Sequence, residues 1–380
     1  MIPQTIDALK TVLETCGVVG AGGGGFPSHL KIDPRTQTIL VNGAECEPLL
    51  QVDQQLMEHY TREILEATHI LANILNAQAV IALKDSYTNA ITAFENIIEE
   101  YPPITLKRLR KTYPAGDEMV LIYEALGAVV PPGGLPMAVG CTVFNVETMY
   151  NMYYAFTENR PVTHKWVTIA GEVEKPVTAL FPIGTTIAQA IQAAGKITTS
   201  HPIYINGGPM MGHTIDSTEK ITKTTKAILV LPQDHLLAYK GRSFPGNSLN
   251  RVASACCQCR NCTDMCPRHL LGHPIEPHRI MRAMAARDAT STAYQGAMYC
   301  SMCGLCEMVA CPQSLAPRTL IKAVKSAMQK EGLRPKPLEA TTVVAERGGR
   351  LVSSHRLTTR LGLAKYDIPA PIQLKGNVPT

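Results

Sequence analysis

The chain has 380 residues, of which 45% are hydrophobic and 18% charged, values that predict two or three ordered domains rather than long disordered tails. It contains no apolar run of the roughly 18 residues needed to cross a bilayer, and its N-terminus has no continuous apolar stretch typical of a secretory signal. The net charge of +5 is dispersed, without a dense basic stretch interleaved with aromatic residues. We therefore expect a cytoplasmic protein with no transmembrane segment and no nucleic-acid partner.

Helices and strands alternate through the first 160 residues. Apolar periodicity predicts helices over 5–16, 53–76 and 87–100, and strands over 38–42, 78–83 and 105–111. Because this alternation is typical of a sheet covered by helices, we predict a three-layer α/β domain over residues 1–160.

The pattern changes after residue 160. Short strands around a single helix at 186–194 predict a small α+β module over 161–240. A cysteine-rich segment follows over 241–332, with helices predicted around 274–287 and 317–330. Pro, Gly and Thr become frequent over 333–380, where we predict an extended C-terminal tail.

A glycine run follows the first predicted helix. Gly20, Gly22 and Gly25 match the G-x-G-x-x-G dinucleotide fingerprint, which needs a strand before it and a helix directly after it. Here a predicted helix precedes the run and Phe26-Pro27 follows it, so the context does not fit the fingerprint. A glycine-rich loop can still present backbone N–H groups to a phosphate or let a flat ring approach closely. A purely structural loop is the alternative, and the run alone does not decide between them.

Twelve cysteines are many for a reducing compartment, and eight of them form two runs, Cys256, Cys259, Cys262 and Cys266, and Cys300, Cys303, Cys306 and Cys311. The first four fit C-x2-C-x2-C-x3-C-P, and the second four repeat this pattern with one extra residue before the last cysteine. This spacing is typical of bacterial two-cluster ferredoxins. Structural zinc is the alternative, but two complete triplets, each followed by Cys-Pro, favour two [4Fe–4S] clusters.

In two-cluster ferredoxins the fourth cysteine of each run binds the cluster held by the other run. We therefore predict two crossed ligand sets. They are Cys256, Cys259, Cys262 and Cys311 for cluster I, and Cys300, Cys303, Cys306 and Cys266 for cluster II.

Several segments together resemble one family, the C subunit of the Rnf electron-transport complex, which is related to the FMN-binding subunit of respiratory complex I. The matching segments are VGAGGGGFPSHLK (19–31), VNGAECEP (41–48), YPAGDEMVLIYEALG (113–127), PPGGLP (131–136) and FNVET (144–148). Within this family the chain is most similar to the cobalamin reductases of propanediol-utilising microcompartments, because it begins directly at the flavin domain and has the x4 spacing before Cys311. The resemblance implies a complex I-like flavin domain, a β-grasp soluble-ligand-binding module and a helical ferredoxin-like dicluster domain.

The resemblance also implies a non-covalent FMN and names residues for its site. Gly22, Gly23, Gly24 and Gly25 would lie against the phosphate and ribityl chain, with Lys31 near the phosphate or the ring. Asn42, Glu45, Glu47 and Asn145 would line the flavin ring. Glu118 and Glu47 would contact the nicotinamide nucleotide.

The implied function is electron transfer from NADH through FMN to the two clusters, and then to an acceptor protein or to cobalamin. A flavin is needed because a hydride carries two electrons and a cluster accepts one. Two alternatives stay open: an Rnf-type relay protein without NADH oxidation, and a corrinoid-binding scaffold with structural clusters. The resemblance further implies association with a peripheral complex or a bacterial microcompartment.

Overall fold

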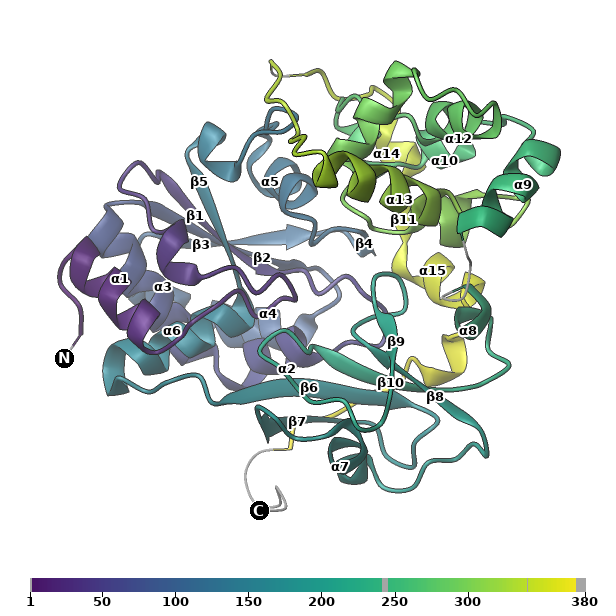
Figure 1. Cartoon of the computed structure of the whole chain (residues 1–380). Coiled ribbons are helices and arrows are strands. Elements are labelled where there is room, and N and C mark those ends of the chain that lie inside the picture. Colours follow the sequence, from purple (N-terminus) through teal and green to yellow (C-terminus); the bar gives the residue numbers. More distant parts are fainter. Residues whose placement is uncertain (1, 241–244, 340, 374–380) are drawn as a thin grey trace. The chain divides into compact units, whose positions relative to one another are not determined.

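The computed structural model of the chain describes residues 2–240, 245–339 and 341–373 (Figure 1). The chain divides into two compact units. The first comprises Met1–Lys111, Val139–Gln233 and Lys365–Thr380, and the second comprises Thr112–Ala138 and Asp234–Ala364. Each unit therefore combines segments that are distant in the sequence.

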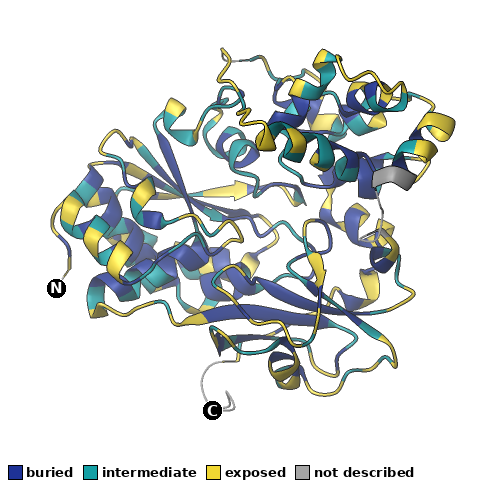
Figure 2. Ribbon diagram, viewed as in Figure 1, coloured by how far each residue is buried: buried dark blue, intermediate teal, exposed yellow. Residues whose placement is uncertain are grey.

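A parallel four-stranded sheet of order β3-β2-β1-β5 organises the N-terminal part of the first unit. Its strands are β1 (Thr38–Gly43), β2 (Gln78–Lys84), β3 (Ile104–Leu109) and β5 (Cys141–Asn145). Its helices are α1 (Ile6–Thr15), α2 (Val52–His59), α3 (Thr61–Leu75), α4 (Thr88–Glu95) and α6 (Val146–Glu158). Figure 2 shows that the inner strands are buried, and the apolar side chains of Ile39, Ile81 and Phe144 join the helices in one core. The predicted mixed α/β class is confirmed.

The helix predicted over 53–76 is two helices in the structure. Tyr60 leaves the helical conformation, with φ −128° and ψ 36°, and so ends α2 and precedes α3. Its ring packs edge-on against Tyr150 at 4.9 Å between centroids and lies 6.0 Å from the Trp166 ring. This aromatic packing involves residues distant in the sequence, which a local apolar pattern does not reveal.

A mixed five-stranded sheet forms the second part of the first unit, with the order β7-β6-β10-β8-β9. Its elements are β6 (His164–Gly171), β7 (Val177–Pro182), α7 (Ile187–Ile191), β8 (Pro202–Asn206), β9 (His213–Ile215) and β10 (Ala227–Pro232). Gly171 has a φ of +104°, and a Cβ there would collide with the Val230 carbonyl. A glycine is therefore required where β6 pairs with β10.

The second unit is mainly helical. The helical elements that the structure describes there are α5 (Glu118–Leu126), η3 (Pro136–Val139, which ends at the boundary), α8 (Leu236–Lys240), α9 (Pro245–Ala255), α10 (Asn261–Asp264), α11 (Pro267–Leu270), α12 (Pro277–Ala285), η5 (Thr292–Tyr299), η6 (Cys306–Ala310), α13 (Pro317–Lys330), α14 (Arg347–Arg350) and α15 (Ser354–Arg360). Proline occupies the start of α11, α12 and α13, where its missing N–H costs nothing.

The structure differs from the predicted domain limits in two ways. Thr112–Ala138, which we predicted in the flavin domain, belongs to the unit that contains the cysteine runs. Its strand β4 (Thr112–Tyr113) pairs with β11 (Val352–Ser353).

The segment 333–380 was expected to be extended, but it contains α14, β11 and α15. Leu357 and Leu361 are fully buried, and the Ser353 side chain caps α15. Residues 347–361 of this segment therefore form a folded part of the second unit. Among the described residues, no helix is both long and apolar enough to span a bilayer.

Candidate functional site

The eight predicted ligand cysteines line two separate cavities in the second unit. The cavities have volumes of about 30 Å³ and about 20 Å³. The first is lined by Cys256, Cys259, Cys262 and Cys311, and the second by Cys266, Cys300, Cys303 and Cys306. The exposed Cys257 also lines the first cavity. Each fourth cysteine thus lies with the triplet of the other run. Among the residues that the structure describes, no group of three or more His, Cys, Asp or Glu side chains is positioned to hold a metal ion.

The loops between these cysteines turn sharply because several of their residues have a left-handed backbone. Gln258, Arg260 and Met302 have φ values of 54°, 65° and 62°. The backbone N–H of Met302 donates to Cys300 Sγ at 3.3 Å, and Gln258 Nε2 donates to Cys256 Sγ at 3.2 Å. Such loops direct donors toward the sulfur atoms, as an iron–sulfur cluster requires.

Burial dominates the electrostatics of the cysteines. Burial, followed by the charges of neighbouring cysteines, raises the pKa of Cys262 and Cys266 to about 12. Thiolates are stable there only when a positively charged group binds them. The four predicted sulfur ligands at each cavity therefore fit an iron–sulfur cluster.

Residues of the segment Thr112–Ala138 contact the loops of the second quartet. The Tyr113 hydroxyl donates to the Cys303 carbonyl at 2.7 Å. Asp117 caps α5 and forms an ion pair of 2.9 Å with Arg268, which lies two residues after Cys266. These contacts were not predicted, although the YPAGDE motif contains both Tyr113 and Asp117.

Glu118, predicted to contact a nicotinamide nucleotide, is the first residue of α5 and belongs to the second unit. The other predicted flavin residues all belong to the first unit.

The glycine loop is closed by its own backbone and is held by the FNVET segment. Gly25 N–H donates to the Gly20 carbonyl at 3.0 Å, and Ala21 N–H donates to Thr148 Oγ1 at 3.0 Å. A Cβ added to Gly23 or Gly24 would meet no protein atom within 4 Å. The loop therefore presents an open backbone face, which fits a closely approaching ligand.

A Cβ at either of the two outer glycines would contact the protein instead. At Gly22 it would lie 3.3 Å from the Asn145 side chain, and at Gly25 it would lie 2.9 Å from Thr224. The loop therefore lies between Asn145 and the β-rich module.

Asn42 and Asn145 are partners in the parallel register at the carboxyl ends of β1 and β5. Ligands bind at this edge in open parallel sheets. Asn145 Oδ1 caps α6, and its Nδ2 donates to Asp53 at 2.8 Å. Asn42 Oδ1 accepts from the Ala44 N–H at 3.1 Å, and Lys31 Nζ donates to the Val143 carbonyl on β5 at 3.0 Å. These predicted residues therefore gather around one end of the sheet.

The two acids of the VNGAECEP segment have different environments. Glu45 is buried, and its Oε2 accepts from Asp53 N–H at 3.0 Å, while its Oε1 has no hydrogen-bond partner among the described residues. Burial, followed by the charge of Asp53, raises the pKa of Glu45 to about 7. Glu47 accepts from the N–H groups of Met210 and Met211 at 2.9 and 2.8 Å. Glu47 thus joins the flavin-type domain to the turn between β8 and β9.

A buried charge network behind Asn145 was not predicted. Lys226 Nζ lies 2.5 Å from Asp53 and 3.3 Å from Glu147, and Lys165 also forms an ion pair with Glu147. Burial lowers the pKa of Lys165 to about 8, although Glu147 opposes this change. The FNVET motif pointed to Glu147, but a lysine in a threonine-rich loop is typical of a solvated surface, so nothing local indicated Lys226.

Comparisons with known proteins agree with this arrangement. Three sequence families match in order: the Nuo51 FMN-binding domain over residues 13–154, the SLBB domain over 166–214 and the 4Fe-4S dicluster domain over 255–316. Cobalamin reductase PduS of Citrobacter freundii is 40% identical over 368 residues, covering 96% of this chain and 81% of that protein. The chain belongs to the PduS family.

More distant relatives share parts of the chain. The C subunit of the ion-translocating oxidoreductase complex of Edwardsiella ictaluri is 31% identical over 275 residues, which are 70% of this chain and 33% of that protein. An NAD+-reducing [NiFe]-hydrogenase in the H2-reduced state has a similar fold, with a TM-score of 0.54 at 20% identity over 87% of this chain and 63% of that chain. The predicted resemblance is confirmed, and this member of the PduS family is a flavin and iron–sulfur electron-transfer protein.

Proposed function

We propose that the protein oxidises NADH through FMN and passes single electrons through two [4Fe–4S] clusters to cobalamin. The observation that carries the proposal is the separation of the eight predicted ligand cysteines into two cavities, each lined by the four members of one crossed set. The names of the PduS relatives support cobalamin as the acceptor. We place the protein in the cytoplasm, including the interior of a bacterial microcompartment, in association with its acceptor or a peripheral complex.

The FMN would be held at the carboxyl ends of β1 and β5. Gly23 and Gly24 would let the phosphate and ribityl chain approach the open backbone, between Gly22 and Gly25. Lys31, Asn42 and Asn145 gather at the same end of the sheet, where they would surround the ring. FMN held there would supply the conversion of a two-electron hydride into the single electrons that iron–sulfur clusters accept.

Three acids would serve the hydride-transfer reaction in this proposal. The buried Oε1 of Glu45 would hold a proton beside the flavin ring, because the pKa of this carboxyl group is close to neutrality. Glu47 and Glu118 would orient the nicotinamide nucleotide. The crossed cysteine sets would bind the clusters.

One observation favours a relay protein without NADH oxidation. The Glu47 carboxylate already accepts hydrogen bonds from Met210 and Met211, which reduces its capacity to contact a nucleotide.

The two functions differ in their response to NADH. Protein purified without oxygen is titrated with NADH, and then with dithionite as the control reductant, while the flavin absorbance is recorded. We expect NADH to bleach the flavin and subsequent addition of cob(III)alamin to restore its absorbance. Bleaching by dithionite but not by NADH would establish the relay function instead.

A further inference from the structure

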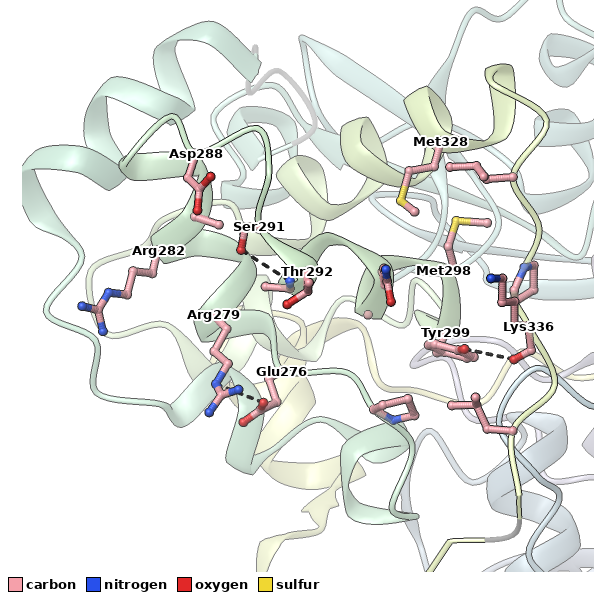
Figure 3. Close-up of a pocket in the computed structure, with 18 of the residues that line it drawn as sticks. Glu276, Arg279, Arg282, Asp288, Ser291, Thr292, Met298, Tyr299, Met328 and Lys336 are labelled. Carbon is pink, nitrogen blue, oxygen red and sulfur yellow. Dashed lines mark hydrogen bonds and ion pairs between the residues drawn. The ribbon is translucent and has the colours of Figure 1, made fainter.

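A cavity of about 820 Å³ lies in the second unit, between α12, η5, the end of α13 and the segment 333–338 (Figure 3). None of the eight cysteines lines it. Its volume falls within the range of roughly 300–1,000 Å³ that is typical of small-molecule sites. The cavity is therefore large enough for a small-molecule ligand that is separate from the clusters.

Cationic side chains line the cavity from two directions. Arg279 and Arg282 come from α12, and Arg334 and Lys336 come from the segment that follows α13. Guanidinium groups bind phosphate through paired charge-assisted hydrogen bonds. These residues indicate a ligand that carries a phosphate.

The two acids that line the cavity already have partners. Glu276 forms an ion pair of 3.1 Å with Arg279. Asp288 Oδ1 accepts from the backbone N–H of Thr290 at 3.0 Å and from its hydroxyl at 2.7 Å. Four cationic and two acidic side chains leave a surplus of two positive charges for an anionic ligand.

Apolar side chains also line the cavity. Met298 and Met328 lie there, as labelled in Figure 3. Leu333 and Leu338 also line it and are 45% and 44% exposed, so their side chains are accessible to a ligand. Methionine side chains adapt their shape to a bound surface. These side chains suit the apolar body of a large, flat molecule.

The apolar wall adjoins the second cysteine quartet. Met298 is two residues before Cys300, which limits the distance between their Cα atoms to about 7 Å. Lys325 of α13 donates to the Cys300 carbonyl at 2.8 Å, and Met328 follows one turn later on the same helix. A molecule in this cavity would therefore be close to a predicted cluster ligand.

We propose that this cavity binds the electron acceptor, a corrinoid that carries a nucleotide phosphate. The macrocycle would contact the methionine and leucine side chains, and the phosphate would contact the arginine and lysine side chains. This inference rests on the proposed function, since NADH supplies the electrons. The step transfers one electron: the cluster bound by Cys300 is oxidised by one electron and cobalt(III) is reduced to cobalt(II). A nicotinamide nucleotide fits less well here, because a hydride donor must react with the flavin rather than with a cluster.

The test measures binding by equilibrium dialysis of the complete protein, with its clusters and flavin, against cyanocobalamin and against cobinamide, which lacks the nucleotide phosphate. The cavity variants are Arg282→Gln and Lys336→Gln. Lys322→Gln is the matched control, because Lys322 is exposed on α13 and does not line the cavity. We expect each cavity variant to bind cyanocobalamin at least fivefold more weakly, while the control binds as the wild type does. Cobinamide binding should be weaker and unaffected by Arg282→Gln.

The possible failures are distinguishable. If the wild type binds and reduces cobalamin and both cavity variants retain wild-type affinity, the cavity is not the acceptor site and the proposed function stands. Equal affinity for cobinamide and cyanocobalamin would overturn the phosphate contact. If the wild type neither binds nor reduces a corrinoid, the proposed acceptor is wrong and this inference fails with it. Iron and flavin contents equal to those of the wild type show that a variant is correctly assembled.

Discussion

Replacing Gly24 with valine tests whether the glycine loop contacts the flavin. A Cβ at Gly24 meets no protein atom within 4 Å, and the backbone there does not require a positive φ. The substitution should therefore change the free energy of unfolding by no more than about 0.5 kcal/mol. If the flavin lies against the loop, however, the new side chain occupies space that the ligand needs.

The expected loss follows from the cost of overpacking, which is about 1–3 kcal/mol for added methyl groups. This corresponds to FMN binding that is weaker by a factor of about 5 to 150. The assay is a fluorescence titration of flavin-depleted protein with FMN, with the iron content and the melting temperature measured in parallel. Gly348→Val is the matched control, since a Cβ at Gly348 also meets no atom within 4 Å. Wild-type FMN affinity in Gly24→Val would refute the proposed contact between this loop and the cofactor.

Three further predictions concern the cysteines and the acids. Cys266→Ala should remove a ligand from the cluster held by Cys300, Cys303 and Cys306. Electron paramagnetic resonance should then detect one three-iron species and one intact four-iron cluster. Damage confined to the cluster of Cys256 would contradict the crossed assignment. Glu45→Gln should stabilise the protein above pH 7 by up to about 3 kcal/mol, because the raised pKa of Glu45 makes the wild type lose stability as the pH rises from about 4.5 to 7. The test compares the melting temperatures of variant and wild type between pH 6 and 8.5. A difference between these melting temperatures that does not grow with pH would exclude the predicted effect of Glu45. Glu118→Gln should slow flavin reduction by NADH about tenfold without affecting reduction by dithionite, and equal stopped-flow rates for variant and wild type would remove Glu118 from the nicotinamide site.

Much of the architecture could be predicted from local sequence patterns, such as apolar runs and cysteine spacing. Strands β1 and β2 lie where the buried apolar runs predict them, and α13 begins at the predicted Pro317. The cysteine spacing carries the most information, because the positions of three sulfur donors within seven residues leave few alternatives in one loop.

Features that depend on distant contacts were not predictable. The break at Tyr60 depends on rings of Tyr150 and Trp166, and the folded C-terminal segment depends on pairing of β11 with β4. Lys226 is buried only because Asp53 and Glu147 surround its charge, and these three residues are widely separated along the chain. The cavity beside Cys300 likewise combines elements whose sequences show no common motif.

The cofactor content of the protein tests the central claim most directly. Protein purified without oxygen is analysed for iron, acid-labile sulfide, zinc and released flavin, each per chain. Two four-iron clusters and one FMN predict about eight iron atoms, about eight sulfides and about one FMN. Stoichiometric zinc without sulfide, or an iron content near four, would contradict the account.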